Sequence, residues 1–166
     1  MENDNPIVIL VGVCGTGKGA VGQQLAKRLQ VPFFDMDKFN NSKDRTKDTL
    51  PQKINMDKWL TSIEELILTQ SSQRGCVLSC SILKKEHRKR LTTTSSHPLD
   101  WVFMNDSFEN VAQRIKKIEL PGRPMSLLRS DFDILEPPKR ALTIDMTYSE
   151  QEIVDTILKY LARKYG

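Results

Sequence analysis

The stretch GVCGTGKGA, residues 12–20, decides the expected fold. It matches the phosphate-binding pattern G-x-x-x-x-G-K-[S/T] at Gly12, Gly17 and Lys18, but Gly19 stands where the pattern has a hydroxyl side chain. An apolar run precedes the stretch and an amphipathic pattern follows it, which predicts a strand, a loop and a helix. In such a loop the backbone N–H groups and the helix N-terminus face phosphate oxygens, and the lysine reaches the terminal phosphates.

We therefore expect this loop to bind the phosphates of a nucleotide; a glycine-rich turn without a ligand is the alternative. The residues expected to contact the nucleotide are Gly12, Val13, Cys14, Gly15, Thr16, Gly17, Lys18, Gly19 and Ala20. Gly19 offers no side chain to ligate Mg²⁺, and Thr16 is expected to point elsewhere. Other residues must then hold the metal.

The rest of the chain repeats the alternation of strand and helix. Short apolar runs at residues 7–11, 31–34, 76–80, 101–104 and 141–144 are typical of strands buried on both faces of a parallel sheet. Between them apolar side chains recur at helical spacing, and Ser149 with Glu152 predicts a capping box at the start of the last helix. The pattern predicts an α/β fold, a doubly wound five-stranded parallel sheet that binds ligands at the carboxyl ends of its strands.

Length and composition agree with one domain over residues 1–166. Hydrophobic residues make up 39% and charged residues 28%, no apolar run approaches a membrane span, and MENDNP does not resemble a signal peptide. We therefore expect a cytoplasmic protein without a membrane partner. The net charge of +4 suits anionic ligands, but no aromatic residues interleave the basic ones, so nucleic acid is not expected. The three cysteines are expected to be free thiols.

A pair of aspartates follows the second apolar run, in FFDMD, residues 33–37. If the strand persists, the i, i+2 spacing places Asp35 and Asp37 on one side. Asp35 is expected to hold Mg²⁺ through water, and Asp37 to accept a proton from a substrate hydroxyl. The alternative is a helix-capping or turn carboxylate, which is common after strands.

A basic segment, CSILKKEHRKRL, residues 80–91, follows the third apolar run. Ser81 is expected to be a helix N-cap, with Lys84, Lys85 and Arg88 in the first turns. Cations at a helix N-terminus oppose the helix dipole, and an anionic ligand removes that cost. We therefore expect Ser81, Lys84 and Arg88 to contact an anionic substrate together with Asp37. The alternative is a solvated basic helix, which we prefer for Lys89 and Arg90; Cys80 is expected to pack in the core.

A helix break and a basic residue mark a possible lid at about residues 117–127. Pro121 and Gly122 end the preceding helix and leave Arg123 on the segment that follows. A basic residue on such a flap can close over the transferring phosphoryl group and exclude water. A surface loop with an incidental arginine is the alternative.

Four stretches together resemble the gluconokinases, small P-loop carbohydrate kinases. GVCGTGKGAVG is similar to the family's phosphate loop, FFDMD to its aspartate pair, CSILKKEHR to CSALKKxYR, and LLRSDFDILEPP to LLxSQFxTLExP. Shikimate kinases are the next relatives, although residues 79–81 lack their triple glycine. The resemblance implies a P-loop NTPase fold of the nucleoside-monophosphate-kinase type, use of ATP and Mg²⁺, a small sugar acid as substrate and, as is common in the family, a homodimer.

The substrate segment departs from the gluconokinase pattern. Asn40 and Asn41 stand in place of a His-Pro, and only Trp59 and Leu60 remain clear at the end of the segment. The family's acidic–arginine group is absent unless residues 57–58 replace it. The nucleotide half of the resemblance is therefore closer than the sugar-acid half.

These patterns predict ATP-dependent phosphoryl transfer to a hydroxyl of a small sugar acid such as gluconate. Lys18 would stabilise phosphate charge, Asp37 would position or deprotonate the hydroxyl, and Arg123 with Arg114 would close over the phosphates. Two alternatives remain. One is a nucleotide-binding protein of this fold with little or no kinase activity, favoured by Gly19 and Ala20; the other is a kinase for another acceptor such as shikimate.

Overall fold

The computed structural model describes residues 5–37, 55–118 and 125–165. Five parallel strands form one sheet in the order β2-β3-β1-β4-β5. The strands are β1 (Ile7–Val11), β2 (Phe33–Asp35), β3 (Cys76–Cys80), β4 (Asp100–Asn105) and β5 (Leu142–Asp145). The helices are α1 (Lys18–Leu29), α3 (Met56–Ser71), α4 (Lys85–Thr94), α5 (Phe108–Ile118), α6 (Met125–Ile134) and α7 (Glu150–Tyr165). The expected α/β fold with a five-stranded parallel sheet is confirmed.

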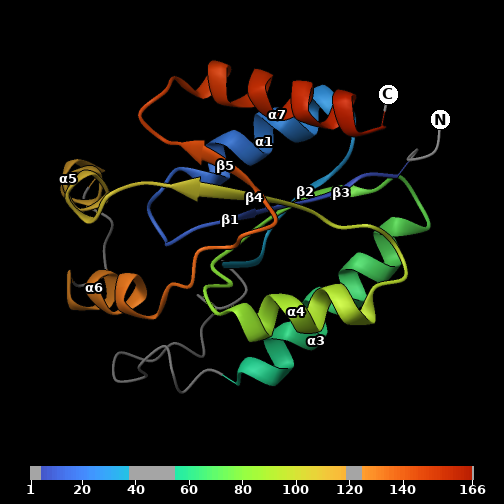
Figure 1. Cartoon of the computed structure of the whole chain (residues 1–166), viewed down its shortest axis with the longest axis horizontal. Helices are drawn as coiled ribbons and strands as arrows, with labels where there is room; N and C mark the ends of the chain where they lie inside the picture. Colours follow the sequence, from blue (N-terminus) through green and yellow to red (C-terminus); the bar gives the residue numbers. More distant parts are fainter. Residues whose placement is uncertain (1–4, 38–54, 119–124, 166) are drawn as a thin grey trace.

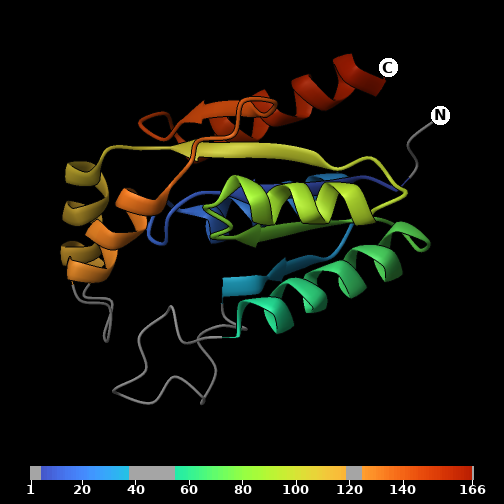
Figure 2. The same ribbon diagram turned by 60° about the horizontal axis from the view of Figure 1, so that its bottom comes forward.

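Helices cover both faces of the sheet, so the expected double winding is also confirmed. Figure 1 shows α1 and α7 on one face and α3 and α4 on the other. The helices α5 and α6 lie beyond the carboxyl ends of the strands, side by side in both views (Figures 1 and 2). Within the described residues, no helix is long and apolar enough to cross a membrane.

The buried apolar side chains form three groups, one on each face of the sheet and one at its carboxyl edge. One joins the sheet to α1 and α7, and a second joins it to α3 and α4. The third lies at the carboxyl edge, where Val13 and Leu83 pack against Val111 of α5 and Leu128 of α6. Every residue of β1 is completely buried, as a continuous apolar run in a central strand predicts.

The observed bounds of β1 and β3 are those that the apolar runs predict, whereas β2 begins two residues later than expected. Gln30 adopts a left-handed conformation, and the N–H of Val31 donates to the carbonyl of Ala26. Val31 therefore closes the end of α1 instead of opening the strand. Its apolar side chain still packs against the core, which explains why the run looks like a strand in the sequence.

The crossing of α1 over β2 depends on a glycine. A Cβ built at Gly22 would lie 2.2 Å from the ring of Phe33, so Gly22→Ala would force the helix and the strand apart. We expect this substitution to lower the free energy of unfolding by about 1–3 kcal/mol, the usual cost of overpacking. Urea unfolding measures the change. Gly19→Ala is the matched control, since a Cβ there meets nothing within 4 Å; equal midpoints for the two variants would contradict the packing argument.

Candidate active site

The phosphate loop connects β1 to α1, and its backbone shape requires glycine at two positions. Gly15 and Gly17 have φ angles of 93° and 94°, in the left-handed region that other residues rarely adopt. Thr16 is buried, and its hydroxyl donates to the carbonyl of Val13 at 3.0 Å. Its side chain therefore points into the loop and supports it from inside, which agrees with the expectation that Thr16 points elsewhere than to the metal.

The N–H groups of this loop fit a phosphate chain. Within the described residues, the backbone N–H groups of residues 14–19 donate to no protein acceptor. Unpaired N–H groups at the start of a helix, next to left-handed glycines, form the concave donor set that binds phosphate oxygens. The chemistry of this donor set thus agrees with the nucleotide site that the sequence predicts.

Lys18 lies across the loop and connects it to the next two strands. Its Nζ atom donates to the carbonyls of Gly12 and Val13, at 2.8 and 2.9 Å. The same atom lies 3.3 Å from the hydroxyl of Ser81 and 3.4 Å from a carboxylate oxygen of Asp37. The side chain of Lys18 is only 4% exposed, so its charge is balanced almost entirely by protein groups. To reach a bound phosphate, Lys18 has to exchange some of these contacts.

Asp37 and Ser81 form a close pair at the carboxyl ends of β2 and β3. The carboxylate of Asp37 accepts the backbone N–H of Ser81 at 2.8 Å and its hydroxyl at 2.9 Å. Asp37 remains 18% exposed, so it can be reached from solvent. The structure thus brings together Lys18, Asp37 and Ser81, three residues that the sequence predicts from three separate motifs. We refer to these three as the Lys18 cluster.

The expected geometry of the two aspartates is wrong. The strand ends at Asp35, the chain turns helical at Met36, and Asp35 accepts the N–H of Asp37 at 3.0 Å. Asp35 therefore caps this turn, which was the alternative interpretation of the motif, and the turn directs Asp37 toward Ser81. Trp59 of α3 fixes the same turn by donating its ring N–H to the carbonyl of Met36 at 3.0 Å.

The expectation that Ser81 is a helix N-cap is also wrong. The helix α4 begins at Lys85 with Lys84 as its N-cap, and the hydroxyl of Ser81 donates to Asp37 instead of capping the helix. Lys84 is exposed, whereas Arg88 is 6% exposed and its guanidinium donates to backbone carbonyls of Ile82, Leu83 and Glu136. Lys84 and Arg88, which the sequence analysis expects to contact the substrate together, therefore lie in different environments: Lys84 is exposed and Arg88 is buried.

Arg114 of α5 contacts the phosphate loop directly. It donates to the carbonyl of Gly15 at 2.9 Å and to the carboxylate of Asp106 at 3.0 Å. The side chain of Asp106 is only 2% exposed, so the pair is held firmly. The sequence analysis did not single out Asp106. Its position directly after a buried strand is the signal that could have found it, the same signal that marks Asp35.

The structure describes only part of the expected lid. Arg123 and most of the segment at residues 117–127 lie outside the described residues. The described α6 begins at Met125, and its Leu128 is completely buried against the loop residues Val13 and Leu83.

Two other sequence expectations concern the neighbourhood of α4. Arg90 is not simply solvated, since it forms ion pairs with Asp57 at 2.7 Å and Glu64 at 2.9 Å and so joins α4 to α3. Hydrogen bonding to Glu64 raises the pKa of Arg90 above its ordinary value. Cys80 is completely buried, and burial raises the pKa of its thiol well above the ordinary range, which agrees with core packing.

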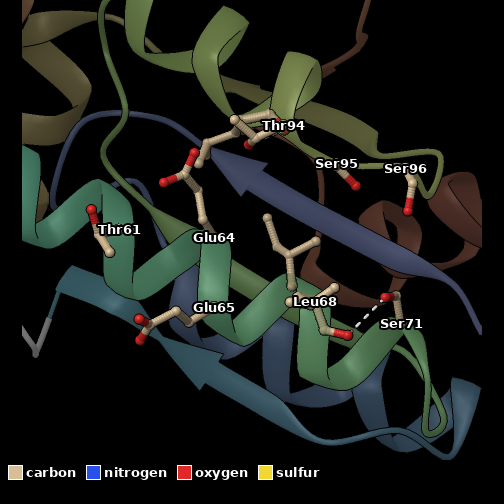
Figure 3. A pocket seen from close by; sticks show the side chains of 10 residues that line it. Thr61, Glu64, Glu65, Leu68, Ser71, Thr94, Ser95 and Ser96 are labelled. Carbon is tan, nitrogen blue, oxygen red and sulfur yellow. Dashed lines mark hydrogen bonds between the residues drawn. The ribbon is translucent and has the colours of Figure 1, made fainter.

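A pocket of about 200 Å³ lies between α3 and the end of α4, and Figure 3 shows the side chains that line it. None of the candidate site residues lines it; it is bordered by Glu64, Leu68, Ser71 and the turn at Ser95. Within the described residues, no three His, Cys, Asp or Glu side chains cluster in a way that could hold a metal ion.

The sequence and the structure of this chain are similar to those of known kinases. The family model described as shikimate kinase matches residues 14–161. A Xenopus tropicalis protein named "Probable gluconokinase" is 30% identical, with 95% of this chain and 94% of the relative covered, and an Arabidopsis thaliana gluconokinase is 29% identical, with 94% and 92% covered. The crystal structure of a gluconokinase from Sinorhizobium meliloti superposes with a TM-score of 0.81 at 28% identity, covering 97% of this chain and 94% of that one. The chain therefore belongs to the gluconokinase family, small-molecule kinases within the group that the shikimate kinase model describes.

Proposed function

We propose that the protein transfers the γ-phosphoryl group of ATP to a hydroxyl of a small sugar acid, with gluconate as the first candidate. The observation that carries this proposal is the Lys18 cluster, which places a cation, a hydroxyl and a carboxylate at the edge of the phosphate loop. A kinase of this kind needs an anionic group for the acceptor hydroxyl and positive charge for the phosphates, and little covalent chemistry. The gluconokinases among the relatives favour a sugar acid as acceptor.

Each residue has a distinct part in this proposal. The N–H groups of the loop and Lys18 bind and neutralise the phosphates, and Arg114 holds the loop in shape through Gly15. Asp37 accepts the hydrogen bond of the acceptor hydroxyl, and Ser81 orients Asp37. The exposed Lys84 attracts the carboxylate of the acceptor, and Arg123 closes over the phosphates.

The residues present fit a magnesium ion held mainly through water. Asp35 uses one carboxylate oxygen to cap the turn at Asp37, and its other oxygen is the one that would accept a hydrogen bond from a metal-bound water. Bound Mg²⁺ would supply neutralisation of the charge that develops on the phosphates. Gly19 contributes no ligand, and it leaves open space where a side chain would begin.

We expect Gly19→Ser to strengthen the use of magnesium. A Cβ at this position meets nothing within 4 Å, so a serine side chain can be added there, and its hydroxyl would ligate the metal directly. The Mg²⁺ concentration for half-maximal rate should fall about tenfold, the factor for one charge-assisted contact of about 1.4 kcal/mol. The measurement is initial rate against Mg²⁺ concentration at saturating ATP. Gly19→Ala, which adds a Cβ but no hydroxyl, is the control and should leave the midpoint where it is; a serine variant with the parent's midpoint would mean that the metal is held without this position.

The proposed function is tested by ADP release with a panel of acceptors. Gluconate, other sugar acids and shikimate are each assayed with and without Mg²⁺. We expect Mg²⁺-dependent release that requires a sugar acid. Turnover with shikimate in preference to every sugar acid would replace the proposed acceptor. ADP binding without acceptor-dependent turnover would favour a nucleotide-binding role.

A further inference from the structure

A buried arginine lies behind the candidate site and is not used by the proposed chemistry. Arg88 emerges from the first turn of α4 and is 6% exposed. One of its terminal nitrogens donates to the carbonyls of Ile82 and Leu83, both at 2.9 Å, and the other donates to the carbonyl of Glu136. At least three of its five N–H groups are thus engaged by backbone, which a surface cation or a residue waiting for substrate would not require.

Glu136 adds two hydrogen bonds to the same segment that Arg88 contacts. Its N–H donates to the carbonyl of Leu83 at 2.9 Å, and its carboxylate accepts the N–H of Lys85 at 3.0 Å. The carboxylate therefore accepts one of the N–H groups at the N-terminus of α4 that have no partner within the helix. The N-cap residue Lys84 provides no side-chain cap there. Together Arg88 and Glu136 attach residues 82–85 to the segment that follows α6. We refer to this set of contacts as the Arg88–Glu136 bridge.

The bridge ends one residue from the Lys18 cluster. Ser81 precedes Ile82, and both hydrogen bonds that Ser81 donates go to Asp37. The side chain of Leu83 is buried against Val13 of the phosphate loop and Leu128 of α6. A displacement of residues 82–83 would therefore move Ser81 and release the carboxylate that faces the acceptor.

We propose that Arg88 and Glu136 are positioning residues for phosphoryl transfer: they fix residues 81–84 and, through Ser81, the carboxylate of Asp37. This inference rests on the proposed function of Asp37. It replaces the expectation from sequence that Arg88 contacts the substrate. It also assigns a task to two motifs, CSILKKEHR and LLRSDFDILEPP, whose arginine and glutamate meet in the folded chain.

The kinetic test separates positioning from substrate binding. Arg88→Met keeps the apolar length of the side chain but removes every donor, and we expect kcat with gluconate to fall about 10–100-fold, as small misplacements of reacting groups do. The KM for gluconate and the affinity for ADP should stay within threefold of the parent. Arg88→Lys should recover part of kcat. Lys89→Met, an identical change at the exposed neighbour on α4, is the control and should match the parent.

Glu136 gives a second, milder pair of variants should Arg88→Met fail to fold. Glu136→Ala removes the acceptor for the N–H of Lys85, and kcat should fall about 3–10-fold. Glu136→Gln retains an acceptor oxygen and should restore the parent's rate. A loss in both variants of the same size would contradict the proposed contact, as would a rise in the KM for gluconate at constant kcat for Arg88→Met.

Amide hydrogen exchange tests the inference without any turnover. In Arg88→Met, exchange should accelerate at least tenfold in peptides that contain residues 81–85 and 135–137, and also at residues 35–37, because Ser81 donates two hydrogen bonds to the carboxylate of Asp37. Faster exchange that stops at residues 82–85 and 135–137 would reduce the bridge to local support and overturn the proposal. Because exchange is independent of the acceptor, this result stands even if gluconate is not the substrate.

Discussion

Replacing Asp37 with asparagine is expected to lower kcat at least about 100-fold, the low end of what positioned acid–base groups contribute. Asparagine is similar in shape and can still accept the N–H of Ser81, but it cannot take a proton or carry the charge that faces Lys18. Affinity for ADP should be equal or higher, because Lys18 no longer has to leave an ion pair to reach the phosphates. Steady-state kinetics and calorimetry measure the two effects.

The control for this variant is Asp155→Asn, which removes a carboxylate from an exposed ion pair with Arg28. Exposed pairs contribute little, so its kcat should stay within about twofold of the parent. Retention of full activity by Asp37→Asn would exclude Asp37 as the group that faces the acceptor. A parallel loss of ADP affinity would instead indicate damage to the phosphate loop.

Removal of the Lys18 side chain is expected to weaken nucleotide binding. Lys18→Ala should raise the Kd for ADP at least about tenfold, since a charge-assisted contact contributes about 1.5 kcal/mol or more. It should lower kcat further, because Lys18 would also neutralise the γ-phosphate oxygens while the group is transferred, an interaction that bound ADP does not offer. Calorimetry with ADP, together with the rate at saturating ATP, separates the two.

A matched control is available on the same helix. Lys27→Ala removes an exposed lysine from the last turn of α1, at the opposite end of the helix from the phosphate loop. Its Kd for ADP should equal the parent's. If Lys18→Ala binds ADP as tightly as Lys27→Ala does, then the loop amides alone hold the nucleotide and the proposed task of Lys18 is wrong.

Most of the fold could be predicted because buried parallel strands leave a strong signal. The runs at β1 and β3 are apolar throughout, and their bounds in the structure are those expected. The start of β2 could not be predicted in this way, since Val31 is apolar for a different reason: it closes α1 behind the left-handed Gln30. Hydropathy records that a side chain is buried but not which backbone conformation buries it.

The candidate site could be predicted as separate motifs but not as one arrangement. Lys18, Asp37 and Ser81 each follow a strand, and the parallel order of the strands brings them to one edge. The turn that directs Asp37 toward Ser81 depends on the cap supplied by Asp35. From the sequence, a capping role for Asp35 was only the alternative to the predicted metal role.

The contacts of Arg88 could not be predicted from the sequence. The three groups that it contacts are backbone carbonyls, and a carbonyl leaves no residue type to recognise in a sequence. The ion pairs of Arg90 could not be predicted for a related reason, because its partners Asp57 and Glu64 belong to another helix. For both residues, basic character on a helix gave no information about which face of the helix they occupy.

The most direct test of the account follows the phosphoryl group itself. ATP labelled in its γ-phosphate is incubated with gluconate and Mg²⁺, and the label is traced to the sugar acid or to inorganic phosphate. The account predicts that label appears in the sugar acid with the parent protein and disappears from it with Asp37→Asn. Label found only in inorganic phosphate, or transfer to the sugar acid that persists in Asp37→Asn, would contradict it.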